Sequence, residues 1–333
     1  MSDVTIVLDE TVEPNAWDKL AASVGGTYFH CHASAMYNAA RSRATPLFVN
    51  AMNAGGQCVG VAAGTISASR LWPFSRFCKK AEFASLPAAA DAESVQAVLA
   101  KMEDALRQEG IFSVGFASYD SPHAATVLSA LGYDLAPRSE FYIDLTKDLD
   151  TIWAEFSRKR RRCIRRAGDQ GVVTRCENTR EAVEMVFRLH GVSMQRRGVE
   201  WGPSEEHIRL VCEHLFGSGV ADAFVTVKGN TPVCAKLVGR FNGRACGLVS
   251  GASDLGYECF AAIEMVWATI RWYKEHGMTV LSLGGAKAEE EGLHEFKRQF
   301  GATAVGEPAG TKVLSRTGMR LDNLRLLVRK VRK

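Results

Sequence analysis

The sequence predicts an α+β fold built from two copies of one module, each a mostly antiparallel central sheet flanked by helices. Helix-type and strand-type patterns alternate along the 333 residues, and each half contains a run of short strands separated by turn residues. The order of patterns restarts near residue 151, although residue identities are not repeated. We therefore expect one domain over 1–150, a second over 151–315 and a basic helix over 316–333.

Cap and turn residues separate the elements of the first half. Pro14 suits the first position of a helix, Asn53–Gly56 form a turn signal between two apolar runs, and Gly110 follows a long amphipathic pattern. In chain order we expect a strand at 4–8, helices at 14–24 and 33–42, a hairpin over 46–67, a loop near 71–77, a helix at 91–110, a strand at 111–117, a helix at 121–132 and a strand at 140–145.

The second half repeats this arrangement. Thr179 and Ser204 are typical helix N-caps, and Gly-Asn and Asn-Gly pairs predict two hairpin turns. In chain order we expect a helix carrying a basic cluster at 158–166, a strand at 171–177, helices at 179–198 and 204–216, strands at 221–227, 233–241 and 244–253, a helix at 258–277, a strand at 278–285, a helix at 289–301 and a closing pair of strands at 304–307 and 311–315.

Charge and cysteine usage narrow the class of protein. The 41 basic and 37 acidic residues leave a net charge of only +4, so anion binding has to come from local clusters. Nine scattered cysteines without a C-x-x-C pair indicate reduced thiols. Neither a secretory signal nor an apolar run long enough to span a membrane is apparent, so we expect a cytoplasmic protein.

His30 and His32 are the strongest candidates for a metal site. At positions i and i+2 of a strand, the two imidazoles would share one face. No further ligand at motif spacing accompanies them, so local interactions are the favoured interpretation and no metal is expected.

A series of short motifs lies between residues 157 and 301. It runs from RRRCIRRA at 160–167 through SMQRRG at 193–198 and WATIRWYKEHG at 267–277 to LSLGG at 281–285 and FKRQFG at 296–301. In this order and spacing the motifs resemble the FemAB-like branch of the GNAT acyltransferase superfamily. Residues 1–150 match that family only in their pattern of elements.

The resemblance implies two tandem GNAT domains and an enzyme that transfers an acyl group to an amine without a bound cofactor. In the best-known branch an aminoacyl-tRNA gives its amino acid to a peptidoglycan precursor peptide, and other branches aminoacylate small natural-product amines. We therefore expect an aminoacyltransferase with aminoacyl-tRNA as co-substrate and a peptide or small-molecule amine as acceptor. The family's coiled-coil insertion has no counterpart here, so tRNA contacts of that kind are not expected.

The resemblance also implies two catalytic residues. Lys297 matches the active-site lysine of the F-K-x-x-F-G motif, where a fixed cation would stabilise the oxyanion formed when an amine attacks an ester. Spacing alone equally allows a surface lysine on an amphipathic helix that packs Phe296 and Phe300 inward. Asp120 matches an acid proposed as general base, and its alternative interpretation is a helix N-cap near His123.

Substrate contacts are expected at basic and aromatic residues. Arg196, or its neighbour Arg197, matches an arginine that meets a phosphate of the acceptor, a role suited to a planar guanidinium. The alternative is a solvated helix end. Arg41 falls near a phosphate-binding position, and Phe296 and Phe300 flank the catalytic lysine.

The basic cluster holds seven basic side chains among the nine residues from Arg158 to Arg166. Apolar residues on the same pattern indicate a helix anchored on one side rather than a free nucleic-acid arm. We expect its outward residues to meet tRNA or a phosphate-bearing acceptor at the rim of a substrate cleft, namely Arg160, Arg161, Arg162 and Arg165.

Two other functions stay open. An acyl-CoA-dependent N-acyltransferase would need a pyrophosphate loop before the helix at 258–277, where SDLGYECFAAIE offers only Gly256 and where Glu258 and Glu264 are expected on a solvated face. A non-catalytic adaptor would bind RNA or a membrane surface through the basic cluster and the amphipathic tail. The tail is more simply a helix that packs its leucines on the first domain, as the resemblance implies, and no stable protein partner follows from the sequence.

Overall fold

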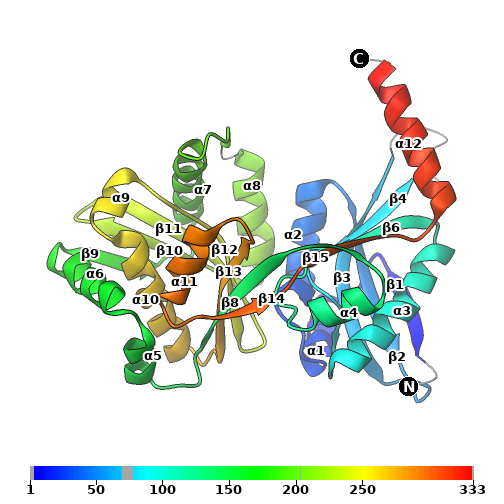
Figure 1. Ribbon diagram of the computed structural model, residues 1–333, viewed down its shortest axis with the longest axis horizontal. Helices are drawn as coiled ribbons and strands as arrows, with labels where there is room; N and C mark the ends of the chain where they lie inside the picture. The colour runs from blue at the N-terminus through cyan, green and yellow to red at the C-terminus, as the bar shows by residue number, and fades with distance from the viewer. Residues whose placement is uncertain (1–3, 70–77, 203, 332–333) are drawn as a thin grey trace. The chain divides into compact units, whose positions relative to one another are not determined.

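The computed structural model describes residues 4–69, 78–202 and 204–331, and the loop expected near 71–77 lies outside them (Figure 1). The chain forms two compact units. Unit 1 comprises Met1–Ser139 and Gly306–Lys333, and unit 2 comprises Glu140–Val305. Both changes of unit fall earlier in the chain than the expected domain bounds, 1–150 and 151–315. The strand at 138–144 already belongs to the second sheet, and the strand at 309–313 belongs to the first.

Unit 1 is organised around one sheet with a single parallel pair among the strand pairs described. The order is β1(Thr5–Asp9), β2(Thr45–Met52), β3(Cys58–Ala68), β4(Lys79–Phe83), β6(Ile111–Phe116), β15(Ala309–Val313), β7(Asp134–Ala136), with β5(Ala88–Ala89) on β3. Strands β4 and β6 are parallel, and α3(Ala92–Gln108) connects them. The other helical elements are α1(Pro14–Ser23), η1(Tyr28–His30), α2(His32–Ser42), α4(Ala124–Ala130) and α12(Arg316–Val331).

Unit 2 has a second sheet of the same kind. The order is β14(Thr303–Gly306), β8(Arg138–Asp144), β13(Val280–Lys287), β12(Arg244–Ala252), β11(Thr231–Phe241), β10(Ala221–Lys228), β9(Val172–Cys176). Strands β12 and β13 are parallel, and α10(Ala261–Glu275) connects them. The other helices are α5(Leu149–Glu155), α6(Arg158–Asp169), α7(Arg180–Gln195), α8(Glu205–Leu210) with a π-helical turn at Val211–Phe216, α9(Asp254–Glu258) and α11(Glu291–Arg298).

The predicted α+β class with two similar modules is confirmed, and so are most elements. Thr179 and Ser204 cap α7 and α8 as expected, each accepting a hydrogen bond from the backbone three residues on. The closing strand pair is wrong, because β14 joins β8 in the second sheet whereas β15 joins β6 and β7 in the first. The strand expected around His30 and His32 is instead a 3-10 turn followed by α2, which begins at His32.

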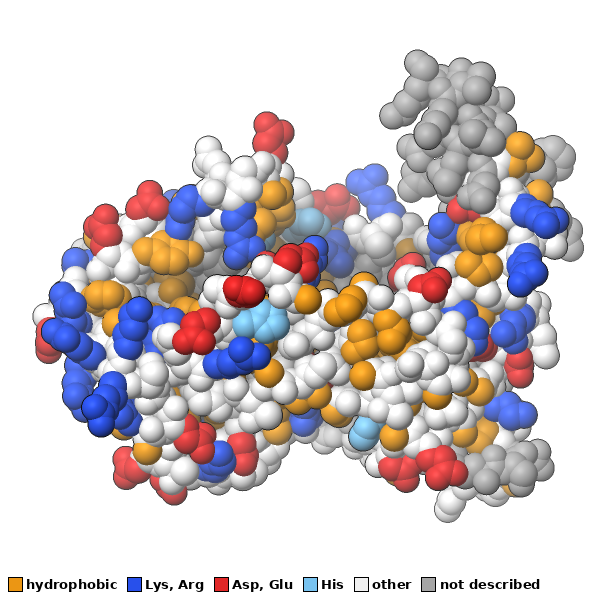
Figure 2. Space-filling model, viewed as in Figure 1, with side chains coloured by type: hydrophobic (Ala, Val, Ile, Leu, Met, Phe, Trp, Pro, Cys, Tyr) orange, Lys and Arg blue, Asp and Glu red, His pale blue; other side chains and the backbone are white. Residues whose placement is uncertain are grey.

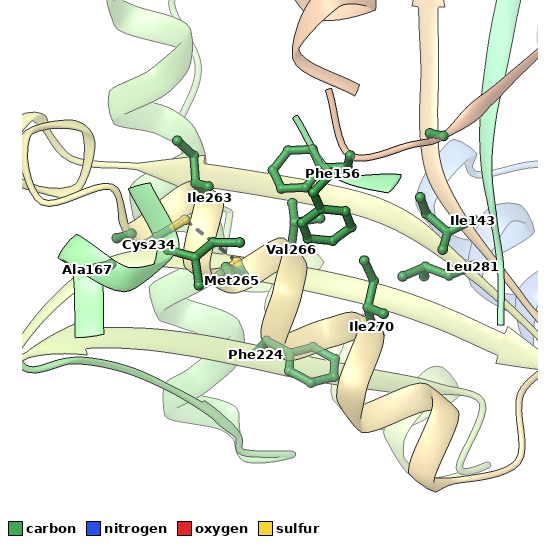
Figure 3. Close-up of a cluster of buried hydrophobic side chains, with 14 of the residues drawn as sticks. Ile143, Phe156, Ala167, Phe224, Cys234, Ile263, Met265, Val266, Ile270 and Leu281 are labelled. Atoms are coloured by element: carbon green, nitrogen blue, oxygen red, sulfur yellow. Dashed lines mark hydrogen bonds between the residues drawn. The ribbon is translucent and has the colours of Figure 1, made fainter. Parts of the chain in front are cut away.

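The core of unit 2 anchors the basic helix. Cys163, Ile164 and Ala167 of α6 are buried in a cluster that also contains Phe156 and Phe300 (Figure 3 shows part of it). The ring of Phe156 meets that of Phe300 edge-on at 5.2 Å. One face of α6 is therefore committed to packing, as its apolar residues predict.

Unit 1 has its own core, and the C-terminal segment contributes to it. α3 buries Leu99, Met102 and Leu106 against the sheet, and Leu314 joins the same cluster. At the start of α12, Asp322 pairs with Lys80 at 3.0 Å. Of the described helices, not one has the length and apolar character needed to cross a membrane.

Candidate active site

In unit 2 the parallel strands β12 and β13 pair over only a few residues and then separate. Their register ends where Cys246 faces Ser282, although β12 continues to Ala252 and β13 to Lys287. At the same level β12 has a bulge, since Leu237 pairs with Val249 and the next residue of β11 pairs with Gly247. Bulges re-aim backbone groups, so backbone donors and acceptors become available where the strands separate.

Gly284 lies on β13 just beyond its last residue paired with β12 and has an unusual backbone conformation. Its φ is +85°, a conformation that favours glycine. The backbone NH of Gly284 donates to Ser282 Oγ at 2.9 Å, and that hydroxyl donates to Glu140 Oε1 at 2.5 Å. Glu140 and Ser282 are both buried, so a dry hydrogen-bonded chain fixes this turn.

Lys297 lies beside that turn. Its side chain comes from α11, is only 5% exposed, and donates from Nζ to the carbonyl oxygens of Gly284 and Gly285 at 2.6 and 2.8 Å. The ammonium also lies 5.1 Å from the centre of the Phe141 ring. Two carbonyl acceptors and a ring face are partners suited to an ammonium group. The interpretation of Lys297 as a surface lysine is therefore wrong, whereas its catalytic role stays a prediction.

The two aromatic residues of the F-K-x-x-F-G motif pack against each other and against neighbouring side chains. Phe300 is fully buried, and Phe296 packs against it with ring centres 5.2 Å apart. Arg160 lies over both rings, at 4.6 Å from Phe296 and 5.4 Å from Phe300. Burial lowers the pKa of Arg160, and its Nε is buried without an acceptor among the described residues.

The remaining arginines of α6 divide into two kinds. Arg161 Nη1 donates to the carbonyl oxygens of Trp153 and Ala154, at 3.4 and 3.0 Å, and so closes the end of α5. Arg162 and Arg165 are exposed, with Arg165 lying 6.0 Å from the Trp153 ring. Of the four predicted contact residues, these two have side chains that a large anion can reach directly.

Arg196 and Arg197 lie at the C-terminal end of α7. Arg196 donates to the carbonyl oxygen of Ala252, pairs with Asp254 at 3.2 Å and covers the Tyr257 ring at 4.4 Å. Arg197 is exposed and lies 3.7 Å from Glu290. Arg196 thus ties α7 to the turn after β12, and the solvated-end alternative describes Arg197 better than Arg196.

Two hollows in the described structure lie away from the parting strands. One in unit 1, of about 800 Å³, has no charged side chain in its lining, which includes Val24, Cys58 and Ala90. The other, in unit 2 and of about 700 Å³, adjoins the end of α7 and is lined by Arg188, Gly191, Gln195, Gly198, Val199, Glu200, Trp201 and Gly202. The second has the polar groups and the aromatic ring that an acceptor molecule would need.

Asp120 and Arg41, the two candidates from the first half, belong to unit 1. Asp120 is buried and has a φ of +51°. Burial of His30 lowers the pKa of its imidazole, and the Asp120 carboxylate opposes this lowering. The N-cap of α4 is His123, so Asp120 does not cap that helix. Arg41 is exposed on α2, 5.9 Å from the Tyr37 ring.

His30 and His32 have separate partners within unit 1. His30 bonds through Nε2 to the carbonyl oxygen of Leu86 at 2.7 Å, whereas His32 stacks on Phe48 at 5.5 Å. Hydrogen bonding and ring packing within unit 1 therefore account for both side chains. Within the described ranges, no group of three or more His, Cys, Asp and Glu side chains is arranged to hold a metal ion.

Two polar residues of unit 2 are more buried than the sequence indicates. Glu264 was expected on a solvated face but is buried, because it accepts a hydrogen bond from Thr174 of the neighbouring strand β9. Burial raises the pKa of its carboxyl group. Glu258 is exposed, as expected. Lys236, on β11, is also buried, and no motif identified it; the only signal was one lysine inside the apolar run VCAKLVG.

The N-terminus of α10 is closed. Cys259 and Ala261 are fully buried, and Phe260 between them has φ +61°. Arg166 of α6 lies 5.2 Å from the Phe260 ring. A pyrophosphate bound at a helix N-terminus needs exposed backbone NH groups in the first turn, and the first residue of α10 does not offer one.

Residues 154–298 match the family model described as Acetyltransferase (GNAT) domain. Among solved structures, FemX is similar with a TM-score of 0.75 at 14% identity, covering 95% of this chain and 99% of FemX. L-PGS from Bacillus licheniformis gives 0.57 at 15% identity, covering 90% and 91%. A tandem GNAT protein from the clavulanic acid biosynthesis pathway, solved without AcCoA, gives 0.54 at 11% identity, covering 94% and 99%. No curated protein matches the sequence.

Proposed function

We propose that the protein is an aminoacyltransferase, because residues 154–298 match the GNAT acetyltransferase family model and the chain has the fold of FemX and of a tandem GNAT protein, in line with the predicted resemblance. It moves an amino acid from aminoacyl-tRNA to an amine of a peptide, a peptidoglycan precursor or a natural product. The observation that carries the proposal is the burial of Lys297 where β12 and β13 separate. Lys297 is thus buried beside the part of β12 and β13 where the two strands no longer pair with each other.

The reaction needs a fixed positive charge at the acyl carbon. When the amine attacks the ester, the carbonyl oxygen gains negative charge, and a preorganised cation in a dry site stabilises that charge more strongly than water does. Lys297 is preorganised because the carbonyl groups of Gly284 and Gly285 hold its ammonium. The same turn is held by the Ser282 hydroxyl, so the position of the cation is set before substrate arrives.

The closed N-terminus of α10 favours an aminoacyl ester over acyl-CoA as donor. Ala261 is fully buried and Arg166 lies over the Phe260 ring, so the first residue of α10 does not offer an exposed backbone NH to a pyrophosphate. An aminoacyl ester on the 3′ end of tRNA carries no pyrophosphate, so it does not need a binding site at the N-terminus of α10. Acyl-CoA stays the alternative donor for the same fold.

The exposed face of α6 supports a polyanionic donor. In Figure 2 Lys and Arg side chains gather at this end of unit 2, over α6 and the neighbouring edge strand. The exposed members are Arg158, Lys159, Arg162, Arg165, Arg166 and, on β9, Arg175. Charges clustered in this way bind phosphates through counterion release, which a chain of net charge +4 does not provide as a whole.

The test is transfer of labelled amino acids from a bulk aminoacyl-tRNA pool to a panel of amines that includes a peptidoglycan precursor peptide and small diamines. We expect amide product that disappears after ribonuclease treatment of the pool. Lys297→Met is expected to lower kcat on the order of 100-fold, as loss of an oxyanion donor does. Lys274→Met is the matched control, since Lys274 also donates to a backbone carbonyl, that of Leu145, but from the last turn of α10.

Three results would count against the proposal. Product formed from labelled acetyl-CoA and unaffected by ribonuclease would assign the acyl-CoA alternative. A folded Lys297→Met protein with wild-type turnover would remove Lys297 from the chemistry. Salt-dependent tRNA binding with no product from either donor would favour a non-catalytic adaptor.

A further inference from the structure

Lys236 stands out among the buried charged residues of unit 2. Its side chain is 7% exposed and projects from the middle of β11, where it pairs with Phe224 on one side and Ser250 on the other. No acceptor among the described residues lies within hydrogen-bonding distance of its Nζ. Lysines this buried are normally paired, so packing alone gives no reason for a lysine at this position.

The side chain of Lys236 ends beside the point where β12 and β13 separate. A methyl group placed on Gly247 would lie 2.9 Å from Lys236 Cε and 3.2 Å from its Nζ, so the absence of a side chain at Gly247 makes room for the amine. The carbonyl oxygen of Gly247 would lie 3.5 Å from a methyl group on Gly284, and Lys297 Nζ would lie 3.8 Å from the same methyl group. Two lysines therefore approach one pair of glycines from different elements.

The groups around the two amines differ. Lys297 has two carbonyl oxygens as acceptors. Lys236 faces the thiols of Cys234 on its own strand and Cys246 on β12, and burial lowers its pKa to about 8. From α10, the carboxyl group of Glu264 acts on the Cys234 thiol but is bonded to Thr174. Lys297 thus has two hydrogen-bond acceptors for an ammonium group, whereas the lowered pKa of Lys236 allows it to be a neutral amine at mildly basic pH.

We propose that Lys236 is a second catalytic residue of this site and accepts the proton that the acceptor amine loses during acyl transfer. The inference rests on the proposed function, in which an amine attacks an acyl ester. It assigns separate tasks to the two lysines: Lys297 stabilises the oxyanion, and Lys236 carries the proton.

The step balances without a further reactant. The lone pair of the neutral acceptor amine forms a C–N bond with the acyl carbon, and the carbonyl π electrons move to oxygen beside Lys297. The nitrogen, now positive, passes one proton to the lone pair of Lys236. When the oxyanion collapses, the C–O bond of the ester breaks, and the departing ribose oxygen takes that proton back from Lys236. The products are an amide and an alcohol, and Lys236 is neutral again.

The experiment compares wild type with Lys236→Met and Lys236→Arg in single-turnover transfer between pH 6 and pH 9.5, with Lys274→Met as control. We expect the wild-type rate to rise with a midpoint near pH 8, as the amine loses its proton. Both Lys236 variants are expected to lose on the order of 100-fold in rate, a typical effect of removing a general base, together with this pH dependence. Lys236→Arg tests charge separately, since it keeps the cation but cannot accept a proton at these pH values.

A second measurement needs no substrate. Because the pKa of Lys236 is lowered in the folded protein, the unfolded chain binds more protons between pH 8 and the ordinary lysine value of 10.5. Wild-type stability should therefore rise through this window relative to Lys236→Met, whose own curve lacks the rise. A difference between the two proteins that does not change with pH would mean that Lys236 stays charged, and would overturn the proposal.

The two proposals fail in distinguishable ways. If wild type transfers only from labelled acetyl-CoA, the aminoacyl-tRNA proposal fails, and the same variants decide the role of Lys236 with that donor. If Lys236→Met keeps the wild-type rate and pH profile with the active donor, the role of Lys236 is refuted while the proposed function stands. A wild type that transfers from neither donor overturns both.

Discussion

Each unit contains one strand–helix–strand crossover that ends in a parallel pair, but the two pairs finish differently. In unit 1 the register of β4 with β6 runs to Phe83 and Phe116, and Ala117 NH continues it by donating to the Phe83 carbonyl at 2.9 Å. In unit 2 pairing stops after three residues of each strand, Arg244–Cys246 against Val280–Ser282. The same strand–helix–strand topology thus gives a parallel pair that stays hydrogen-bonded in unit 1 and a parallel pair that separates in unit 2.

Glycines next to these pairs show how the difference arises. In unit 1 a methyl group on Gly64 would overlap the Phe83 ring, and one on Gly115 would overlap the Glu82 carboxylate. In unit 2 the corresponding space at Gly247 is taken by the Lys236 amine. In unit 1 a ring and a carboxylate occupy these spaces, whereas in unit 2 the space holds a lysine amine whose pKa is lowered by burial, and strongly perturbed groups of this kind are candidates for functional sites. Under the proposed function we expect acyl transfer in unit 2 and a supporting role for unit 1.

The largest expected effect comes from replacing one glycine of positive φ in each unit by alanine. Gly284→Ala should cost about 1–2 kcal/mol of folding free energy, since φ +85° disfavours a Cβ, and should lower transfer on the order of 100-fold by displacing Lys297. Gly132→Ala in unit 1 has the same kind of strain, at φ +71°, with open space around it. Urea unfolding and kcat would be measured for both. Equal losses of activity would contradict the assignment of chemistry to unit 2.

A second, smaller effect is expected on binding to tRNA. Combining Arg162→Gln with Arg165→Gln should weaken binding of uncharged tRNA several-fold and flatten its salt dependence, because exposed guanidinium groups on α6 are removed. Arg161→Gln should instead cost about 1 kcal/mol of stability, since the α5 carbonyls lose their donor. Fluorescence anisotropy and thermal melts separate the two. Lys101→Gln, an exposed change on α3 of unit 1, serves as the control, and equal weakening by it would show that the basic surface is not specific to unit 2.

The smallest effect concerns the crossover helices. In unit 1, Glu103 of α3 pairs with Lys312 at 2.6 Å, whereas Glu264 of α10 in unit 2 has Arg271 only at 3.8 Å and has a raised pKa because it is buried. Above its ordinary value of 4.5 the folded state of Glu264 binds more protons than the unfolded state, so wild-type stability falls as pH rises through the raised pKa. Glu264→Gln should remove that fall and change stability at neutral pH by less than about 1 kcal/mol. Unfolding curves at pH 5 and pH 7 would measure it, and a fall that persists in the variant would assign it to other groups.

Local patterns were sufficient for most of the fold. The N-caps Thr179 and Ser204, the turn at Asn53–Gly56 and the apolar spacing before Gly110 all correspond to boundaries in the structure. The pairing of β14 and β15 was not predictable in this way, because both strands follow α11 closely and only tertiary packing sends them to different sheets. Periodicity specifies an element, whereas its partner depends on residues far away in the chain.

The site was predicted where a motif existed and missed where it did not. The F-K-x-x-F-G motif pointed to Lys297, and the structure added its burial and its two carbonyl partners. Arg161 carries the same charge as Arg162, and only the geometry of α5 shows that it has a capping role. Lys236 and Glu264 lie in ordinary strand and helix patterns, so their burial depends on neighbours that spacing does not reveal.

The course of β15 has a consequence for how the protein is made. This strand lies between β6 and β7, yet it is synthesised after the whole of unit 2. A nascent chain that has completed Ser139 therefore holds β6 and β7 without the strand that separates them, and an open strand edge invites wrong pairing. All strands of the unit 2 sheet precede residues 309–313 in the chain, whereas the unit 1 sheet is incomplete until those residues have been made. Because unit 1 includes residues 306–333, a truncated chain that lacks them would leave its sheet without the strand between β6 and β7.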